Sequence, residues 1–128
     1  MLKKYDWLAS AWAIIILILC SLPGNQFPDL SFLDWLRPDK IVHLILFGAF
    51  SFLLMKAFTI PGRKFILRKV RFWGVIISIA YGALIEVLQQ YVIIDRHGDI
   101  RDAIANALGA FCGLWLFNYL YSRTLRTE

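Results

Sequence analysis

The chain has 128 residues, of which 59% are hydrophobic and 18% are charged, and its formal net charge is +5. A soluble domain is about 45–50% apolar, so this composition, with a mean hydropathy of +0.62, excludes an ordinary soluble domain and favours a membrane protein. The positive charge does not indicate a nucleic-acid partner. The densest basic run, residues 63–71, separates two apolar segments, as a cytoplasmic membrane loop does.

Four apolar segments follow one another along the chain, and no alternating strand pattern competes with them. Each is close to the ~20 residues that a helix needs to cross the hydrocarbon core, and a helix satisfies its own backbone where water is absent. Pro23-Gly24 and Pro61-Gly62 end the first two segments. The sequence therefore predicts an all-α polytopic membrane protein, a single domain over residues 1–128, with a bundle of four transmembrane helices at about 5–22, 39–60, 72–94 and 102–121.

The connection between the first two segments, from Asn25 to Pro38, is not uniformly polar. Large apolar residues such as Phe27 and Trp35 alternate there with aspartates. This pattern is typical of a short segment lying on the membrane surface. We expect an outer interfacial segment here, and the sharper hypothesis is a lid over the polar cluster described below.

The basic residues predict the orientation in the membrane. They concentrate at the N-terminus, in the loop 63–71 and at the C-terminus, whereas the basic residues of the other two loops are diluted by aspartates. Cytoplasmic loops of membrane proteins carry the excess of lysine and arginine. Both termini are therefore expected in the cytoplasm.

Polar side chains gather near the predicted outer ends of three helices. Asp39 and His43 are four residues apart, as are Asp102 and Asn106, so each pair shares one helical face. Glu86 is predicted about 12 Å below the outer end of its helix, by helical rise. The candidate ligand-binding residues are Asp39, Lys40, His43, Glu86, Gln89, Arg96, Asp102 and Asn106.

Ionisable groups at membrane depth usually face a cavity or one another. Glu86 and His43 are the candidate catalytic acid or base, because their surroundings can tune the protonation of both. His43, Glu86 and Asp102 could together ligate a cation, but the chain has no HExxH motif, and neither a metal nor a cofactor is predicted. A purely structural network that holds the helices together stays open as the alternative.

Gly109 and Gly113 continue the face of Asp102 and Asn106 along the fourth segment. Two small residues four apart let another helix approach closely in a membrane. The pair therefore predicts either a contact in a homo- or hetero-oligomer or a groove for a lipid chain.

The chain contains a series of spaced pieces: Ser21-Leu22-Pro23-Gly24, Asp39-Lys40-Ile41-Val42-His43 with Phe47, Gly82 with Glu86 and Gln89, and the spaced series Arg96, Asp102, Asn106, Gly109 and Gly113. Their order and spacing resemble the VanZ-like family of bacterial membrane proteins. The resemblance covers roughly residues 21–113. It implies a polytopic protein of the bacterial cytoplasmic membrane, and the family's founding member is associated with low-level resistance to the glycopeptide teicoplanin.

Three functions stay open at this point. The favoured one is binding or modification of an anionic envelope lipid or a lipid-linked cell-wall precursor at the outer leaflet, with Arg96 and Lys40 holding the headgroup and glycopeptide susceptibility affected as a consequence. A small proton-linked transporter is the second, although the polar stripe stops in the outer half of the membrane. The third is a non-catalytic membrane interaction subunit with a structural polar network.

Overall fold

The computed structural model describes an all-helical chain, which confirms the predicted fold class. Within the described residues there are four helices and no strand: α1 (Lys4–Ser21), α2 (Pro38–Phe58), α3 (Leu67–Tyr91) and α4 (Ile100–Thr127). All four are long and apolar enough to cross a membrane, which fits a multi-pass membrane protein. The described residues are 4–22, 38–60, 66–93 and 98–127, without the side chains of 38–39 and 124–127.

The helix ends differ from the expected ones for local reasons. α2 begins at Pro38, because proline lacks the amide that a first helical residue leaves unbonded. α3 begins at Leu67, five residues earlier than expected, and α4 continues to Thr127, six residues further. Helical hydrogen bonding does not stop where the apolar run stops, so the basic and polar flanks continue both helices.

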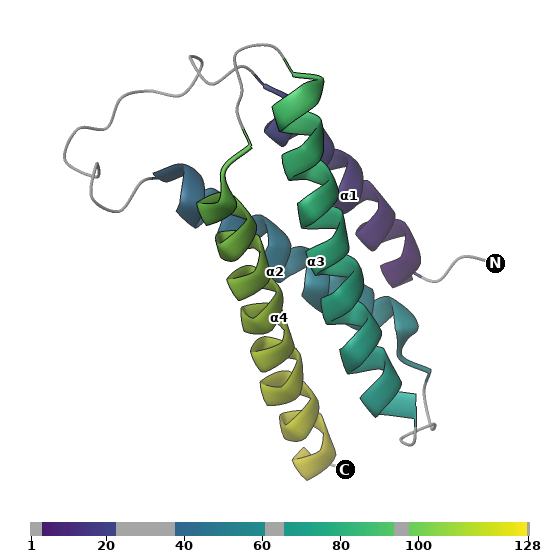
Figure 1. Ribbon diagram of the computed structural model, residues 1–128. Helices are drawn as coiled ribbons and strands as arrows, with labels where there is room; N and C mark the ends of the chain where they lie inside the picture. Colours follow the sequence, from purple (N-terminus) through teal and green to yellow (C-terminus); the bar gives the residue numbers. More distant parts are fainter. Residues whose placement is uncertain (1–3, 23–37, 61–65, 94–97, 128) are drawn as a thin grey trace.

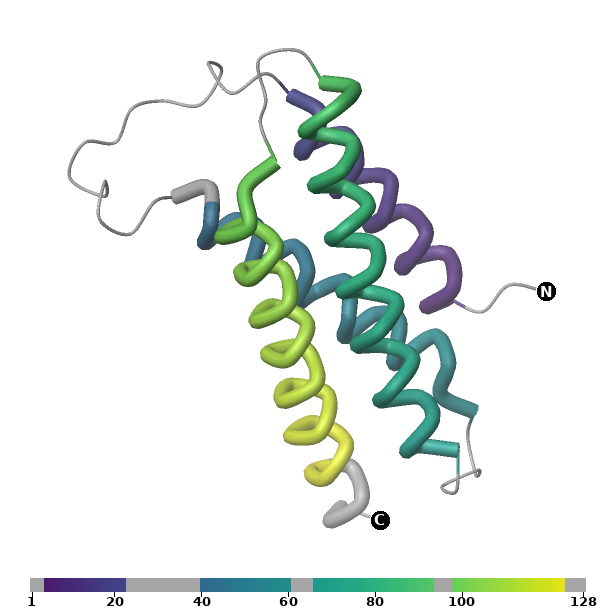
Figure 2. The backbone as a smooth tube through the Cα atoms, in the orientation of Figure 1, coloured from purple at the N-terminus to yellow at the C-terminus, as the bar shows by residue number. Residues whose placement is uncertain are grey.

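The helices form an up-and-down bundle (Figures 1 and 2). α1 and α3 run in one direction, and α2 and α4 run in the other. One end of the bundle therefore holds the last residues of α1 and α3 and the first residues of α2 and α4; we call it the site end and the opposite one the far end. The interfacial segment expected at 25–38 falls almost entirely outside the described residues, since only the start of α2 at Pro38 belongs to both.

α2 packs most extensively against α4, and glycines make this contact possible. A Cβ atom built on Gly109 would collide with the carbonyl oxygen of Leu44, and one built on Gly113 would collide with that of Gly48. The hydroxyl of Ser51 donates to the carbonyl of Ala110 at 3.0 Å across the same contact. In this chain, α2 therefore occupies the face of Gly109 and Gly113 for which the sequence suggested another chain or a lipid chain.

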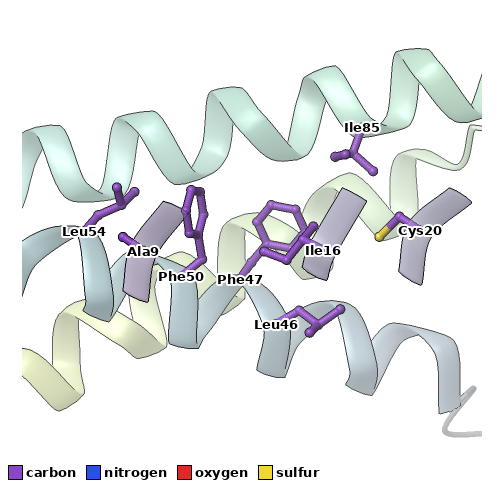
Figure 3. Packing of buried hydrophobic residues seen from close by; sticks show 8 residues of the cluster. All are labelled: Ala9, Ile16, Cys20, Leu46, Phe47, Phe50, Leu54 and Ile85. Carbon is purple, nitrogen blue, oxygen red and sulfur yellow. The ribbon is translucent and has the colours of Figure 1, made fainter. Parts of the chain in front are cut away.

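α1 joins the bundle through an apolar cluster shared with α2 and α3 (Figure 3). Ile16 and Phe47 are completely buried in it, beside Ile85 of α3. Two polar atoms fix the position of α1 more specifically: the indole Nε1 of Trp12 donates to the carbonyl of Leu46 at 2.9 Å, and the hydroxyl of Tyr81 donates to a carbonyl of α1 at 2.7 Å. α1 is therefore a packed member of the bundle along with the other helices.

Candidate functional site

The first turn of α4 is held by its own cap, Asp99. One carboxylate oxygen of Asp99 accepts the amide hydrogen of Arg101 at 2.8 Å, and its carbonyl accepts those of Asp102 and Ala103. An aspartate at this position satisfies amides that would otherwise lack a partner at the start of a helix. The cap fixes where Asp102 and the next turn of α4 face.

Lys40 of α2 joins α2 to the start of α4 through two carboxylates. Its ammonium lies 2.5 Å from Oδ1 of Asp102 and 3.3 Å from Oδ2 of Asp99. The amide of Arg101, followed by the Lys40 ammonium, holds the pKa of Asp99 below its usual value. Asp99 is therefore ionised at neutral pH, and Lys40 is shared between two negative charges.

One turn further into the bundle, His43 of α2 meets Asn106 of α4. The two side chains are joined between Nδ1 of His43 and Oδ1 of Asn106 at 2.8 Å, and both are buried. An amide oxygen only accepts hydrogen bonds, so Nδ1 carries the proton and the lone pair of a neutral His43 is on Nε2. Gly82 of α3 makes room for this pair, since a Cβ there would lie 3.0 Å from Cβ of Asn106.

Glu86 of α3 completes the buried group. Its Oε2 accepts the amide hydrogen of Asp99 at 3.1 Å, whereas Oε1 is buried without a hydrogen-bond partner among the described residues. α3 ends at Tyr91, so Glu86 lies about 8 Å below the helix end by helical rise and not the expected 12 Å. Glu86 is thus within reach of the first turn of α4.

The two glutamines of α3 face different partners. Gln89 donates from Nε2 to the carbonyl of Cys20 at 2.9 Å, so its hydrogen bond goes to α1 and not to α2 or α4. Gln90 accepts the amide hydrogen of Gly98 at 2.8 Å. Both bonds hold the chain at the site end, and Gln89 leaves its Oε1 buried without a partner in the described part of the chain.

The structure brings together five of the eight expected ligand-binding residues: Lys40, His43, Glu86, Asp102 and Asn106. Of the other three, Gln89 is bonded to α1, and Arg96 lies outside the described residues. Asp39 belongs to the first turn of α2, but its side chain also lies outside the description. Asp99 is an addition to the expected set, and its signal in the sequence was an aspartate directly before an apolar helix.

The site holds more negative charge than the positive side chains bonded to it neutralise. Glu86, Asp99 and Asp102 supply three carboxylates, against the single ammonium of Lys40 among the side chains bonded to them. His43, Glu86 and Asp102 are each less than one-tenth exposed. Buried carboxylates close to one another are costly unless a cation or a proton neutralises them. The arrangement therefore suits binding of a cation or transfer of a proton, as well as interhelical bonding.

A family model described as VanZ/LLP1 matches residues 6–121 of this chain. The match covers nearly all of the sequence, and it includes most of α1 and α4, all of α2 and α3, and every candidate residue discussed above. Neither the curated proteins nor the solved structures with which the chain was compared gave a match. The chain belongs to the VanZ/LLP1 family, as its sequence motifs predicted.

Proposed function

We propose that this VanZ/LLP1 family member binds the anionic headgroup of an envelope lipid at the site end, on the outer side of the bacterial cytoplasmic membrane. The observation that carries the proposal is the placement of the buried ionisable and amide side chains: in the described part of the chain, α2, α3 and α4 all contribute them at one end of the bundle. Interhelical bonding alone would not restrict them to one end. A headgroup site would, because headgroups lie at one membrane surface.

The distribution of basic residues supports an outward-facing site end. The far end carries Lys56 at the end of α2, Arg68, Lys69 and Arg71 at the start of α3, and Arg123 near the end of α4. Basic residues close to membrane spans mark the cytoplasmic side. With the far end inside, both termini are cytoplasmic and the cluster faces the outer leaflet.

Lys40 is a described cation that a headgroup can reach, together with the exposed Arg101 in the first turn of α4. The side chain of Lys40 is 20% exposed, and that of its partner Asp99 is 38% exposed, whereas Asp102 is buried. A phosphate that approaches the site end can therefore take part of the Lys40 ammonium from the more exposed carboxylate. Glu86 and His43, deeper in the bundle, are then the candidates to move a proton if the lipid is modified.

A transporter is less well supported. Nearer the middle of the bundle, the buried polar side chains in the described ranges are Ser51 and Ser78, and each donates to a backbone carbonyl. Proton pathways use further ionisable groups across the membrane, whereas the buried ionisable side chains in the described ranges, His43, Glu86 and Asp102, all lie at the site end.

The test is a thermal melt of the purified protein in detergent, with an anionic lipid (polyprenyl phosphate or phosphatidylglycerol) and with zwitterionic phosphatidylcholine as the comparison. A ligand that binds only the folded protein stabilises it by about 2.7 kcal/mol at 100 times its Kd. We expect the anionic lipids to raise Tm in the wild type and this rise to disappear in Lys40→Gln.

Lys69→Gln is the matched control, because it removes the same charge from an exposed position at the far end. It should keep the full rise in Tm. An equal rise with the zwitterionic lipid, or a rise that persists in Lys40→Gln, would overturn the headgroup site and favour a structural network serving protein partners.

An effect on glycopeptide susceptibility would follow from a headgroup site that takes a lipid-linked cell-wall precursor, and family membership supports it. Expression of the wild type in a susceptible bacterium should raise the inhibitory concentration of teicoplanin, and expression of Lys40→Gln at the same level should not. Equal inhibitory concentrations of teicoplanin with and without the wild-type protein would show that this chain does not affect glycopeptide susceptibility.

A further inference from the structure

Three buried side chains from three different helices converge at the site end. His43 of α2, Glu86 of α3 and Asp102 of α4 each offer a nitrogen or oxygen atom, and these three atoms lie within 4.8 Å of one another. The residues are 4%, 8% and 5% exposed. Two ligands of one metal ion lie at most about 4.2 Å apart, twice a metal–ligand distance of ~2.1 Å, so a small inward movement of the side chains is enough to close a site.

Each of the three side chains is oriented by a second residue and keeps a further atom for a ligand. Asn106 accepts the proton of Nδ1 of His43, which leaves the lone pair of Nε2. Lys40 is bonded to Oδ1 of Asp102, which leaves Oδ2. Metal-binding histidines and carboxylates are commonly fixed by such outer hydrogen bonds.

Glu86 supplies the independent observation. The Asp99 amide is bonded to its Oε2, but its Oε1 is buried and unpartnered within the described ranges. A buried carboxylate oxygen without a donor is costly, and the costs rise when a second carboxylate is close. A bound cation would remove both costs.

The charge balance agrees with a divalent ion. The carboxylates of Glu86, Asp99 and Asp102 carry three negative charges, and the Lys40 ammonium returns one of them. Among the described side chains bonded to this cluster, the carboxylates therefore exceed the ammonium by two charges. The Arg101 guanidinium, which also acts on Asp99, is exposed to solvent. A divalent cation cancels the two excess negative charges.

We propose that His43, Glu86 and Asp102 bind one divalent transition-metal ion, Zn²⁺ or Mn²⁺. One imidazole with two carboxylates suits these ions better than Mg²⁺, which prefers oxygen ligands and retained waters. Three protein ligands leave a position open for a further ligand. If the proposed function holds, that ligand is a phosphate oxygen of the lipid headgroup, and the metal is what lets an acidic cluster attract an anion.

The first experiment measures the metal without any lipid. Chelator-treated protein in detergent is titrated with Zn²⁺, Mn²⁺ or Mg²⁺ by calorimetry, and Tm is recorded with each ion. We expect one Zn²⁺ or Mn²⁺ per chain, a higher Tm with either ion, and little response to Mg²⁺. Mn²⁺ bound at this site should change its electron paramagnetic resonance spectrum and be displaced by Zn²⁺.

Glu86→Gln tests the assignment of the ligands. Glutamine keeps the shape and can still accept the Asp99 amide, but it removes a buried charge. We expect metal affinity to fall at least about 100-fold, because a direct ligand should matter no less than the outer residues, which are worth 10–100-fold. Without metal the variant should melt at or above the Tm of the wild type. Asp6→Asn, the same charge change in the first turn of α1 at the far end, is the control and should bind metal as the wild type does.

Absence of stoichiometric binding of Zn²⁺ or Mn²⁺ to the wild type would overturn the metal site, and so would unchanged affinity in Glu86→Gln. The calorimetry contains no lipid, so these outcomes are separate from the lipid test. If the protein binds no metal but anionic lipid still raises its Tm, the proposed function stands and the metal site is wrong. If the protein binds metal but no lipid changes its Tm, the metal site stands and the proposed function is wrong.

Discussion

At the far end of the bundle, α2, α3 and α4 meet through apolar side chains, whereas at the site end the same three helices meet through ionisable and amide side chains. Met55, Val70 and Phe117 form a buried cluster at the far end. At the site end the Lys40–Asp102 ion pair and the bond between His43 and Asn106 take that place. The same three helices are thus held together by apolar packing at the far end and by hydrogen bonds and an ion pair at the site end.

This difference separates stability from function. Lipid chains are as apolar as leucine, so apolar packing in a membrane stabilises helix contacts mainly through fit. Buried charges cost free energy and are retained where they bind or react. We therefore expect substitutions at the far end to lower stability with little effect on ligand binding. Substitutions at the site end should weaken ligand binding with a smaller effect on stability.

Breaking the α2–α4 contact, which joins the two ends, should have the largest effect. In Gly109→Ala the new methyl group meets the backbone carbonyl of Leu44, and backbone yields less than a flexible side chain. We expect a loss of about 3 kcal/mol, measured by reversible unfolding in mixed micelles. Ser122→Ala, a change at an exposed position of the same helix, is the control; an equal loss in both variants would contradict the special role of the α2–α4 contact.

Emptying the far-end cluster should come next. Phe117 is 2% exposed and packs edge-to-face on Phe52. In a membrane the water-transfer part of the cost disappears, and the cavity that remains makes Phe117→Ala destabilising by about 2 kcal/mol. Zn²⁺ titration and the lipid melts should give the same affinities as the wild type. Weaker metal or lipid binding in this variant would show that the two ends are not separate.

Asn106→Ala, at the site end, should have the opposite result: a small loss of stability and a clear loss of metal affinity. Removing the side chain frees Nδ1 of His43 from its partner. Interhelical hydrogen bonds in membranes are worth about 0.6–1.7 kcal/mol, and outer residues of metal sites change affinity 10–100-fold. We expect a stability loss of about 1 kcal/mol together with metal affinity at least tenfold weaker. A stability loss with undiminished metal affinity would reduce Asn106 to interhelical bonding.

The smallest effect should come from Asp99→Asn. The Lys40–Asp99 pair is partly exposed, and such pairs contribute about 0–1 kcal/mol. Asparagine caps a helix as well as aspartate does, and the backbone amide of residue 99 can still donate its hydrogen bond to Glu86. We expect a stability change below about 0.5 kcal/mol. A loss of several times this size would mean that Asp99 holds the start of α4 by its charge and not by its cap.

The amino-acid sequence by itself determined that the chain forms four helices, their order and which end of each carries polar side chains. Helix formation in a membrane is a local matter, because each segment must satisfy its own backbone, so the length of an apolar run predicts a helix well. Helix ends were predicted less well, as α3 shows, because basic residues continue the hydrogen-bonding pattern beyond the apolar run.

The tertiary structure decided which faces meet. Spacing along α4 placed Asp102, Asn106 and Gly109 on one face, but it could not say that α2 of the same chain covers Gly109. Nor could the spacing along α3 predict that Gln89 bonds to α1 while Glu86 lies beside His43 and Asp102. The rotation of each helix about its axis is set by contacts between residues far apart in the chain. A site built from three helices therefore leaves no local motif in the sequence, even though each of its side chains can be found there.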